Sequence, residues 1–245
     1  MKQTDTHHYY SRITGRENLL ITIGDSYTAG VGVYTSNQLQ DYRDGVKTKN
    51  DLFVETIKTC GAGSYPAYLA DLMDYDLINL GIAGGSNSAS IKRLINHYDN
   101  NYIEQYNNVV VIWLLTDPAR ISFYSGGHVS SYVGNNDSVR LSYIKDVLKS
   151  DLDAELETKF YLQTAFYFCK AREYKFFYGT AFYNISSINQ IINHPASNLN
   201  NMLGIEQFAT LVPGEYISLC GHPDTQGYKI IAERMFSAIK KRQRK

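Results

Sequence analysis

Uninterrupted apolar runs recur along the chain and are separated by polar stretches. The clearest run is Val109–Leu115, VVVIWLL, which shows no alternation of apolar and polar residues. A strand buried on both faces of a parallel sheet has this pattern, because neither face meets water. The predicted strands are Leu19–Ile23, Tyr75–Leu80, Val109–Leu115, Lys175–Gly179 and the short Tyr216–Leu219.

Other segments carry apolar residues at helical spacing. The predicted helices are Ser64–Met73, Ser88–His97, Ser142–Arg172 with a break near Asp151–Asp153, and Thr225–Lys241. Strands that alternate with helices predict an α/β fold, in which a mostly parallel five-stranded sheet is covered on both faces. We find no repeat and no linker, and therefore predict one domain over residues 1–245. Residues 1–17 are expected to be flexible or peripheral, and residues 241–245 to form a basic tail.

Polar stretches are predicted to form loops. Val33–Thr59 is predicted as a helix start followed by a loop over the site, which could act as a substrate-facing lid. Ile121–Val139 is rich in Gly, Ser, Asn and Tyr and is predicted as a loop or a small hairpin. Ile185–Thr210 is polar with short helical pieces.

Composition excludes several classes of partner. Lys plus Arg and Asp plus Glu both number 24, so no basic surface is predicted for nucleic acid or an anionic membrane. No segment approaches the ~20 apolar residues of a membrane span, and the N-terminus lacks the apolar core of a signal peptide. The three cysteines (Cys60, Cys169, Cys220) match neither a disulfide framework nor a zinc motif. We expect a cytoplasmic protein without metal or cofactor.

A serine follows the first predicted strand. In Leu19–Gly32, LLITIGDSYTAGVG, Gly24 ends the apolar run and Ser26 lies where a parallel strand would pass into a helix. Open α/β sheets bind ligands beyond the carboxyl ends of their strands, so Ser26 is a candidate nucleophile. The alternative is that Asp25 or Ser26 only caps the next helix.

Three further segments are predicted to meet Ser26 at the same edge of the sheet. The second strand leads into NLGIAGG (79–85), the third ends at LLTD (114–117), and CGHPDTQGY (220–228) precedes the last helix. In this order and spacing the chain resembles the SGNH or GDSL hydrolases, which are acyl-ester hydrolases with a flavodoxin-like, three-layer α/β/α fold. The blocks GDSYTAG and GHPDTQGYKIIA are the most specific part of the resemblance, which extends from Gly24 to Gly227.

The resemblance implies Ser26 as nucleophile and His222 as general base. It also implies an oxyanion hole made by the backbone N–H of Ser26, the backbone N–H of Gly84 and a side chain at the third strand end. The chemistry fits, because a serine hydroxyl needs a nearby base, and histidine titrates in the required range. Preorganised donors stabilise the negative oxygen of the tetrahedral intermediate, and Gly84 allows a close backbone approach.

Two positions depart from the family pattern. Thr116 stands where the family has Asn, and its hydroxyl could donate one hydrogen bond to the oxyanion. Leu219 stands where the family has the Asp three residues before the histidine. A backbone carbonyl could orient His222 instead, leaving a Ser–His dyad. Asp224 could also replace the missing carboxylate, although its position favours capping of the last helix.

The remaining supporting candidates are Asp25, Asp117, Asp224 and Arg120, the last either fixing its loop, binding an acidic substrate group or lying free on the surface. A Cys220–His222 pair is conceivable but disfavoured, because adjacent strand residues point to opposite faces and nothing marks the thiol as activated.

The leading hypothesis is a serine esterase acting on a carbohydrate O-acetyl or other short-acyl ester. The expected partner is therefore a small-molecule or glycan acyl ester, without nucleic acid or membrane. The alternatives are a non-catalytic ligand- or carbohydrate-binding module on the same fold, favoured by the changes at positions 116 and 219, and an acyltransferase.

Overall fold

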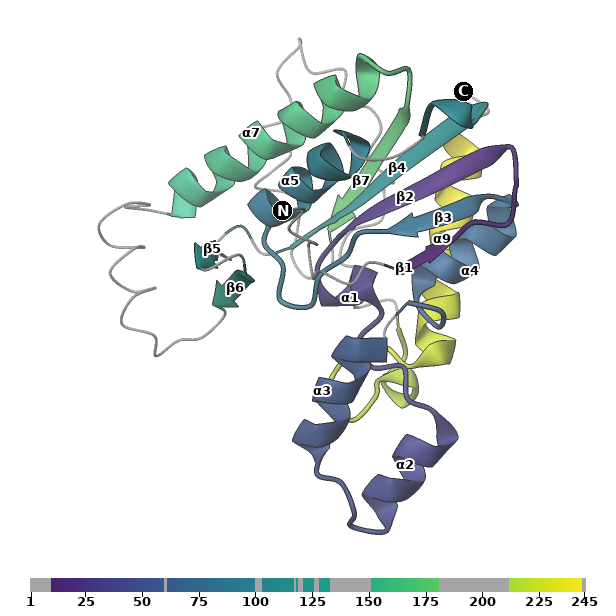
Figure 1. Cartoon of the computed structure of the whole chain (residues 1–245), viewed down its shortest axis with the longest axis vertical. Coiled ribbons are helices and arrows are strands. Elements are labelled where there is room, and N and C mark those ends of the chain that lie inside the picture. The colour runs from purple at the N-terminus through teal and green to yellow at the C-terminus, as the bar shows by residue number, and fades with distance from the viewer. Residues whose placement is uncertain are drawn as a thin grey trace, which may run out of the picture.

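The computed structural model has a five-stranded sheet of strand order β1-β3-β2-β4-β7 at its centre (Figure 1). The structure describes residues 10–59, 61–99, 103–116, 118, 121–125, 128–132, 151–180 and 212–243. The strands are β1 (Tyr10–Arg12), β2 (Asn18–Gly24), β3 (Asp76–Asn79), β4 (Asn108–Leu115) and β7 (Lys175–Thr180). β2, β3, β4 and β7 are parallel, and β1 is antiparallel to β3. The mostly parallel sheet predicted from the apolar runs is confirmed.

Helices cover both faces of the sheet. α5 (Asn87–Asp99) and α7 (Asp151–Lys170) lie on one face, and α4 (Tyr65–Met73) and α9 (Thr225–Gln243) lie on the other (Figure 1). Successive residues of β2 point to opposite faces, so Leu19 and Ile21 pack under α5 and α7 while Leu20 packs under α4 and α9. This is the predicted three-layer α/β/α architecture.

The fifth strand is not the predicted one. Tyr216–Leu219 does not join the sheet, because Tyr216 ends a 3₁₀ helix (Gly214–Tyr216) and Ile217 forms only an isolated bridge with Pro223. The edge strand is instead β1, within the segment expected to be peripheral. Its register with β3 pairs Tyr10 with Asn79 and Arg12 with Leu77. The N-terminal segment from residue 10 is therefore part of the sheet.

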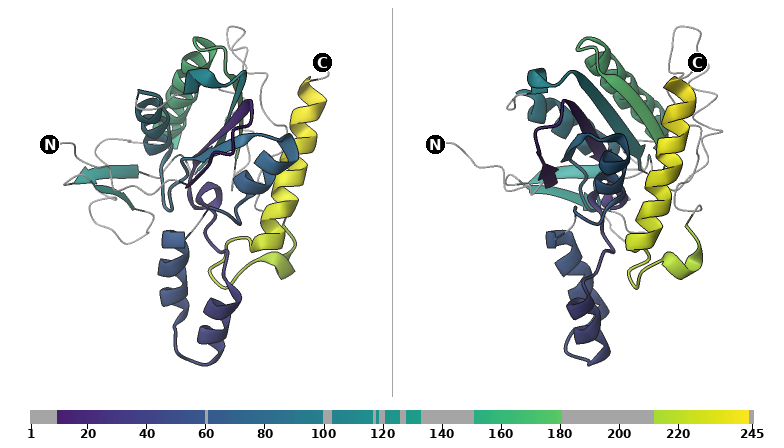
Figure 2. Two further views of the ribbon diagram at one scale, coloured as in Figure 1. Left: turned by 45° about the vertical axis from the view of Figure 1, so that its right-hand side comes forward. Right: turned by 90° about the vertical axis from the view of Figure 1, so that its right-hand side faces the viewer.

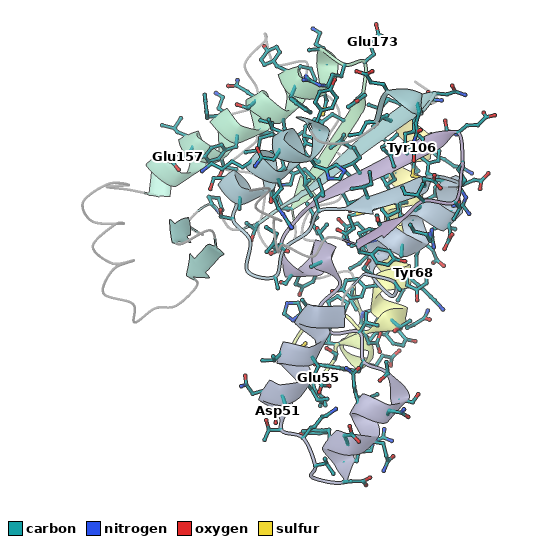
Figure 3. All side chains as sticks on the ribbon, in the orientation of Figure 1. Asp51, Glu55, Tyr68, Tyr106, Glu157 and Glu173 are labelled. Carbon is teal, nitrogen blue, oxygen red and sulfur yellow. The ribbon has the colours of Figure 1, made fainter. Side chains whose placement is uncertain are left out.

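The stretch predicted as a loop over the site forms two helices. α2 (Ser36–Arg43) and α3 (Lys49–Thr59) make a hairpin that projects from the body of the molecule in all views (Figures 1 and 2). Figure 3 shows Asp51 and Glu55 on α3. Lys47, between the helices, pairs with Asp41 at 2.8 Å and with Glu55 at 2.9 Å. α2 has no buried residue, and caps and ion pairs hold its ends, so its apolar spacing is weak.

Two other predictions fall partly outside the described residues. Ile121–Val139 contains the predicted hairpin, formed by β5 (Ile121–Ser125) and β6 (His128–Tyr132). The predicted helix Ser142–Arg172 is described from Asp151 onward as α7. Residues 185–210 lie outside the described part. None of the helices described combines the length and hydrophobicity needed to cross a bilayer.

Candidate active site

Ser26 begins a short helix directly after the central strand β2. β2 ends at Gly24, and α1 (Ser26–Ala29) follows with Asp25 as its N-cap. The Asp25 carboxylate accepts a hydrogen bond from the Tyr27 backbone N–H at 3.0 Å. Asp25 is therefore the residue that caps α1, and the Ser26 side chain does not take part in capping. The Ser26 residue is 7% exposed, at the carboxyl edge of the sheet.

The turn after β3 is fixed against this strand end. The buried Asn79 accepts from the Gly81 backbone N–H at 3.0 Å and donates to the Thr28 carbonyl at 2.7 Å. The Ile82 N–H donates to the Gly24 carbonyl at 3.0 Å. Gly84 follows with φ +73°, a left-handed conformation that suits glycine. The turn carrying Gly84 is thus bound to both ends of the Gly24–Thr28 segment, although an oxyanion role for Gly84 stays a prediction.

The hydroxyl of Thr116 is directed to the cap of α1. Thr116 Oγ1 donates to Asp25 Oδ2 at 3.0 Å, and both residues are buried. A hydroxyl has one proton, and in this arrangement a carboxylate accepts it. The predicted donation from the Thr116 side chain to an oxyanion is therefore not supported by this geometry. Asp117 and Arg120 are outside the described residues.

Asn87 holds the end of β4 and was not singled out from the sequence. Its amide accepts from the Thr116 backbone N–H and donates to the Thr116 carbonyl, both at 3.0 Å. The only available signal was its place in the Gly-rich stretch after β3. Asn87 and Asp25 together fix both the backbone and the side chain of Thr116.

His222 lies against the Ser26 hydroxyl. The distance from His222 Nε2 to Ser26 Oγ is 2.8 Å, although the two residues are 196 positions apart in the chain. The Tyr27 ring packs beside the imidazole, with 5.2 Å between the ring centroids. Burial, followed by the charges of Asp25 and Cys220, raises the pKa of Tyr27 to about 12, so this ring stays neutral at neutral pH. The Ser26–His222 distance lies within the hydrogen-bond reach that a serine nucleophile and a general base require.

A tight turn presents His222. The Ser218 N–H donates to the His222 carbonyl at 2.7 Å, and the Gly221 N–H donates to the Ser218 carbonyl at 2.9 Å. Gly221 has φ +81°, which favours glycine. After the turn, Asp224 accepts from the Gly227 N–H at 2.8 Å and so takes the helix-capping position at the start of α9.

The second ring nitrogen of His222 faces a cysteine. Cys220 Sγ lies 3.4 Å from His222 Nδ1, and Ser218 Oγ lies 3.2 Å from the same sulfur. Burial by itself would raise the pKa of the Cys220 thiol. Hydrogen bonds to His222 and Ser218, together with the nearby Tyr34 hydroxyl, outweigh burial and lower this pKa to about 6. The sequence argument against a Cys220–His222 pair was wrong, because the two residues are two positions apart and lie in a turn. The signal was their spacing around Gly221.

Comparison with protein-family models and with curated protein sequences finds no match. Solved structures do match. A carbohydrate esterase, described as having an active site with divergent catalytic and non-catalytic binding functions, gives a TM-score of 0.58 at 14% identity, covering 93% of this chain and 70% of that one. An acetyl xylan esterase from the rumen bacterium Butyrivibrio proteoclasticus gives 0.53 at 12% identity, covering 95% and 65%. A family two carbohydrate esterase from Clostridium thermocellum, in complex with cellohexaose, gives 0.51 at 14% identity, covering 93% and 65%.

The chain has the SGNH/GDSL hydrolase fold. This confirms the fold that the motif blocks imply, and the neighbours are esterases by their descriptions. Within the SGNH fold the two departures from the motif have distinct surroundings. Leu219 is 38% exposed, whereas Thr116 is buried and hydrogen-bonded to Asp25. In the described part of the chain, no three His, Cys, Asp or Glu side chains are grouped to hold a metal ion.

Proposed function

We propose that the protein is a serine esterase that cleaves short-acyl esters through an acyl-enzyme on Ser26. The observation that carries the proposal is the 2.8 Å contact between Ser26 Oγ and His222 Nε2 at the carboxyl edge of the sheet. A serine hydroxyl within hydrogen-bond reach of an imidazole can be deprotonated as it attacks, and this is the requirement for nucleophilic catalysis.

The reaction follows from this pair. Ser26 Oγ attacks the acyl carbon while His222 Nε2 takes its proton, giving a tetrahedral intermediate with a negative oxygen. The backbone N–H groups of Ser26 and Gly84 are the proposed donors to that oxygen. The intermediate collapses to the acyl-enzyme, and His222 gives the proton to the leaving alkoxide. Water, activated by the same imidazole, then releases the acid and restores Ser26.

The proposed substrate class is an O-acetyl or other short-acyl ester of a carbohydrate. Support comes from solved neighbours described as carbohydrate esterases, one of them bound to cellohexaose. The same acyl-enzyme could pass its acyl group to a sugar hydroxyl, so acetylated xylan fragments should be assayed for released acetate and for transfer to an added sugar. Release of free acetate alone identifies a hydrolase.

The test uses the full chain and p-nitrophenyl acetate. Wild type and Ser237→Ala, a control serine exposed on α9, should release nitrophenolate, and a fluorophosphonate probe should label both. Ser26→Ala should lose hydrolysis and labelling while keeping the wild-type circular dichroism spectrum. Undiminished hydrolysis by Ser26→Ala overturns the assignment. A folded wild type that neither hydrolyses nor becomes labelled favours the non-catalytic binding module instead.

A further inference from the structure

We propose that Cys220 is a positioning residue that completes a Ser26–His222–Cys220 relay, with its thiolate accepting the Nδ1–H of His222. The inference rests on the proposed function and names the group that takes the place of the missing carboxylate. Its basis is the placement of the two partners at opposite nitrogens of one ring. Ser26 Oγ is 2.8 Å from Nε2, and Cys220 Sγ is 3.4 Å from Nδ1.

The fold of the turn decides which residue faces the imidazole. The Ser218–His222 turn is closed by two backbone hydrogen bonds and by the left-handed Gly221. In this turn the side chain of Cys220 reaches Nδ1, while Leu219 is exposed to solvent. The position three residues before the histidine is therefore not the position that supports the ring in this protein.

Polar groups converge on the sulfur. Ser218 Oγ lies 3.2 Å from Sγ. The Tyr34 hydroxyl, from the segment after α1, is buried nearby and has no hydrogen-bond partner among the described residues. Among the residues that the structure describes, the other titratable groups around the thiol are His222 on its own turn, Tyr27 on α1 and Tyr228 on α9. Both of these tyrosines also feel Asp25. Donors facing the sulfur stabilise its anion, consistent with a thiol pKa of about 6.

The proton positions explain why a thiolate is needed. With sulfur as the anion, Nδ1 carries the ring proton and Nε2 is free to take the Ser26 proton. The imidazolium that forms during attack then lies against a negative charge, as it does beside the carboxylate of a Ser-His-Asp triad. If the sulfur instead keeps its proton and donates to Nδ1, the ring proton sits on Nε2 and the base is lost. The sulfur forms no covalent bond in this cycle, and its thiolate is unchanged at the end.

The proposal predicts a defined pH profile. The Cys220–His222 pair must lose one shared proton before the site is active, so kcat/KM rises with pH through the apparent pKa of the pair. A thiolate beside the ring stabilises the protonated form of the pair. Cys220→Ala should therefore move the rising limb to lower pH and lower kcat by roughly 10- to 1000-fold with little change in KM. A carboxylate removed from a triad costs about 10,000-fold, and the longer thiolate contact is weaker.

Cys220→Ala and three further variants, all in the full chain, test the geometry. Cys220→Asp, which places a carboxylate at the same position, should recover at least tenfold of the activity that Cys220→Ala loses. The double variant Cys220→Ala/Leu219→Asp, which restores the carboxylate three residues before His222, should recover none. Cys169→Ala, which removes a buried thiol on α7, is the control and should keep the wild-type profile.

Several results would overturn the proposal. Wild-type kcat and an unshifted pH profile in Cys220→Ala would show that the sulfur does not act on the ring. Rescue by Leu219→Asp in the double variant would contradict the geometry of the turn. Hydrolysis that survives Ser26→Ala but not Cys220→Asp would make Cys220 the nucleophile, in which case the proposed function fails as well.

A measurement without substrate separates the two proposals. In ¹⁵N-histidine NMR spectra the His222 signals of wild type should show a proton on Nδ1 at pH 8, and Cys220→Ala should lose this preference for one ring nitrogen. Because this measurement needs no turnover, it stands even if the protein hydrolyses no ester. Identical His222 spectra at pH 8 in the two proteins refute the relay, whatever the esterase assay gives. Circular dichroism of each variant shows that it is folded.

Discussion

Gly32 packs directly against the turn that carries His222. A β-carbon at position 32 would lie 2.8 Å from His222 Cβ and 2.7 Å from the Pro223 carbonyl oxygen. Gly32 follows α1, so the segment that bears Ser26 and the turn that bears His222 meet here without an intervening side chain. The 2.8 Å contact between Ser26 Oγ and His222 Nε2 is made by these two segments.

Gly32→Ala should therefore displace the histidine turn. Shifts of about 1 Å at a reacting group cost on the order of 100-fold in rate, and we expect a loss of that size in kcat/KM on p-nitrophenyl acetate. Gly45→Ala is a matched control, because Gly45 also has a positive φ (+73°) but no atom within 4 Å of the added carbon. Both variants carry backbone strain of roughly 1–2 kcal/mol. Equal activity in the two variants would show that the approach at Gly32 is not needed.

Thr116 should act through Asp25 rather than through the substrate. Thr116→Val removes the donor to a buried carboxylate, and we expect the free energy of unfolding to fall by about 1–3 kcal/mol. Thr116→Ser keeps the hydroxyl and should keep most of both stability and activity. Urea unfolding and the esterase rate are measured on each variant. A Thr116→Val protein of wild-type stability that loses kcat by 100-fold or more would instead make this hydroxyl an oxyanion donor.

The stability of the fold should depend on the N–H₂ group of Asn79 as well as on its side-chain oxygen. Asn79→Asp keeps the size of the side chain but sets an oxygen against the Thr28 carbonyl, where the amide now donates at 2.7 Å. The buried repulsion should lower the free energy of unfolding by about 2 kcal/mol or more, measured by urea unfolding. Asn108→Asp makes the same change at an exposed amide, which donates to Asn18 Oδ1. It should lower the free energy of unfolding by less than about 1 kcal/mol. Similar losses at both positions would contradict a special role for Asn79.

The sheet and the contact between Ser26 and His222 could be predicted because each leaves a local signal. Apolar runs such as Val109–Leu115 need no partner to be recognised, and the serine and histidine blocks lie at strand and helix ends. The partners of these groups are a different matter. Donation from Thr116 to Asp25 joins residues 91 positions apart, and no local pattern distinguishes it from donation to a substrate. Cys220 was undervalued for a related reason, since the turn conformation rather than strand alternation sets its direction.

The edge strand β1 and the helix α2 were missed because polar contacts define them. β1 has only three residues, YSR, and the neighbouring Thr14 and Gly15 are tied to Asp76 at the start of β3. α2 has no buried residue, so helical spacing of apolar positions cannot reveal it. Conversely, Tyr216–Leu219 has the residue types of a strand but lies beyond the sheet, where the chain turns toward His222.

The last prediction tests the contacts that hold the N-terminal segment to the sheet. Asp76, fully buried at the start of β3, accepts hydrogen bonds from Thr14 N–H and Oγ1 at 2.8 Å and from Gly15 N–H at 3.2 Å. Burial opposes the charge, but these hydrogen bonds and one from the Arg16 N–H outweigh it and lower the pKa of Asp76 from its usual range. Asp76→Asn would set an amide N–H₂ against N–H donors, and should lower the free energy of unfolding by about 2–3 kcal/mol at pH 7.

The pH dependence gives this prediction its sign. Because the pKa of Asp76 is lower in the folded state, its ionised form stabilises the fold above the unfolded pKa of about 3.9, and this contribution is lost as the pH falls through the folded value. The difference in stability between wild type and Asp76→Asn should thus be constant from pH 7 to about 5 and shrink below about 4. Asp74→Asn removes an exposed carboxylate that pairs with Arg16. Its free energy of unfolding should differ from that of wild type by less than about 1 kcal/mol at every pH. A constant difference for Asp76→Asn down to pH 2 would mean that its charge does not hold the segment, and that the lost packing of Thr14 and Gly15 accounts for the destabilisation.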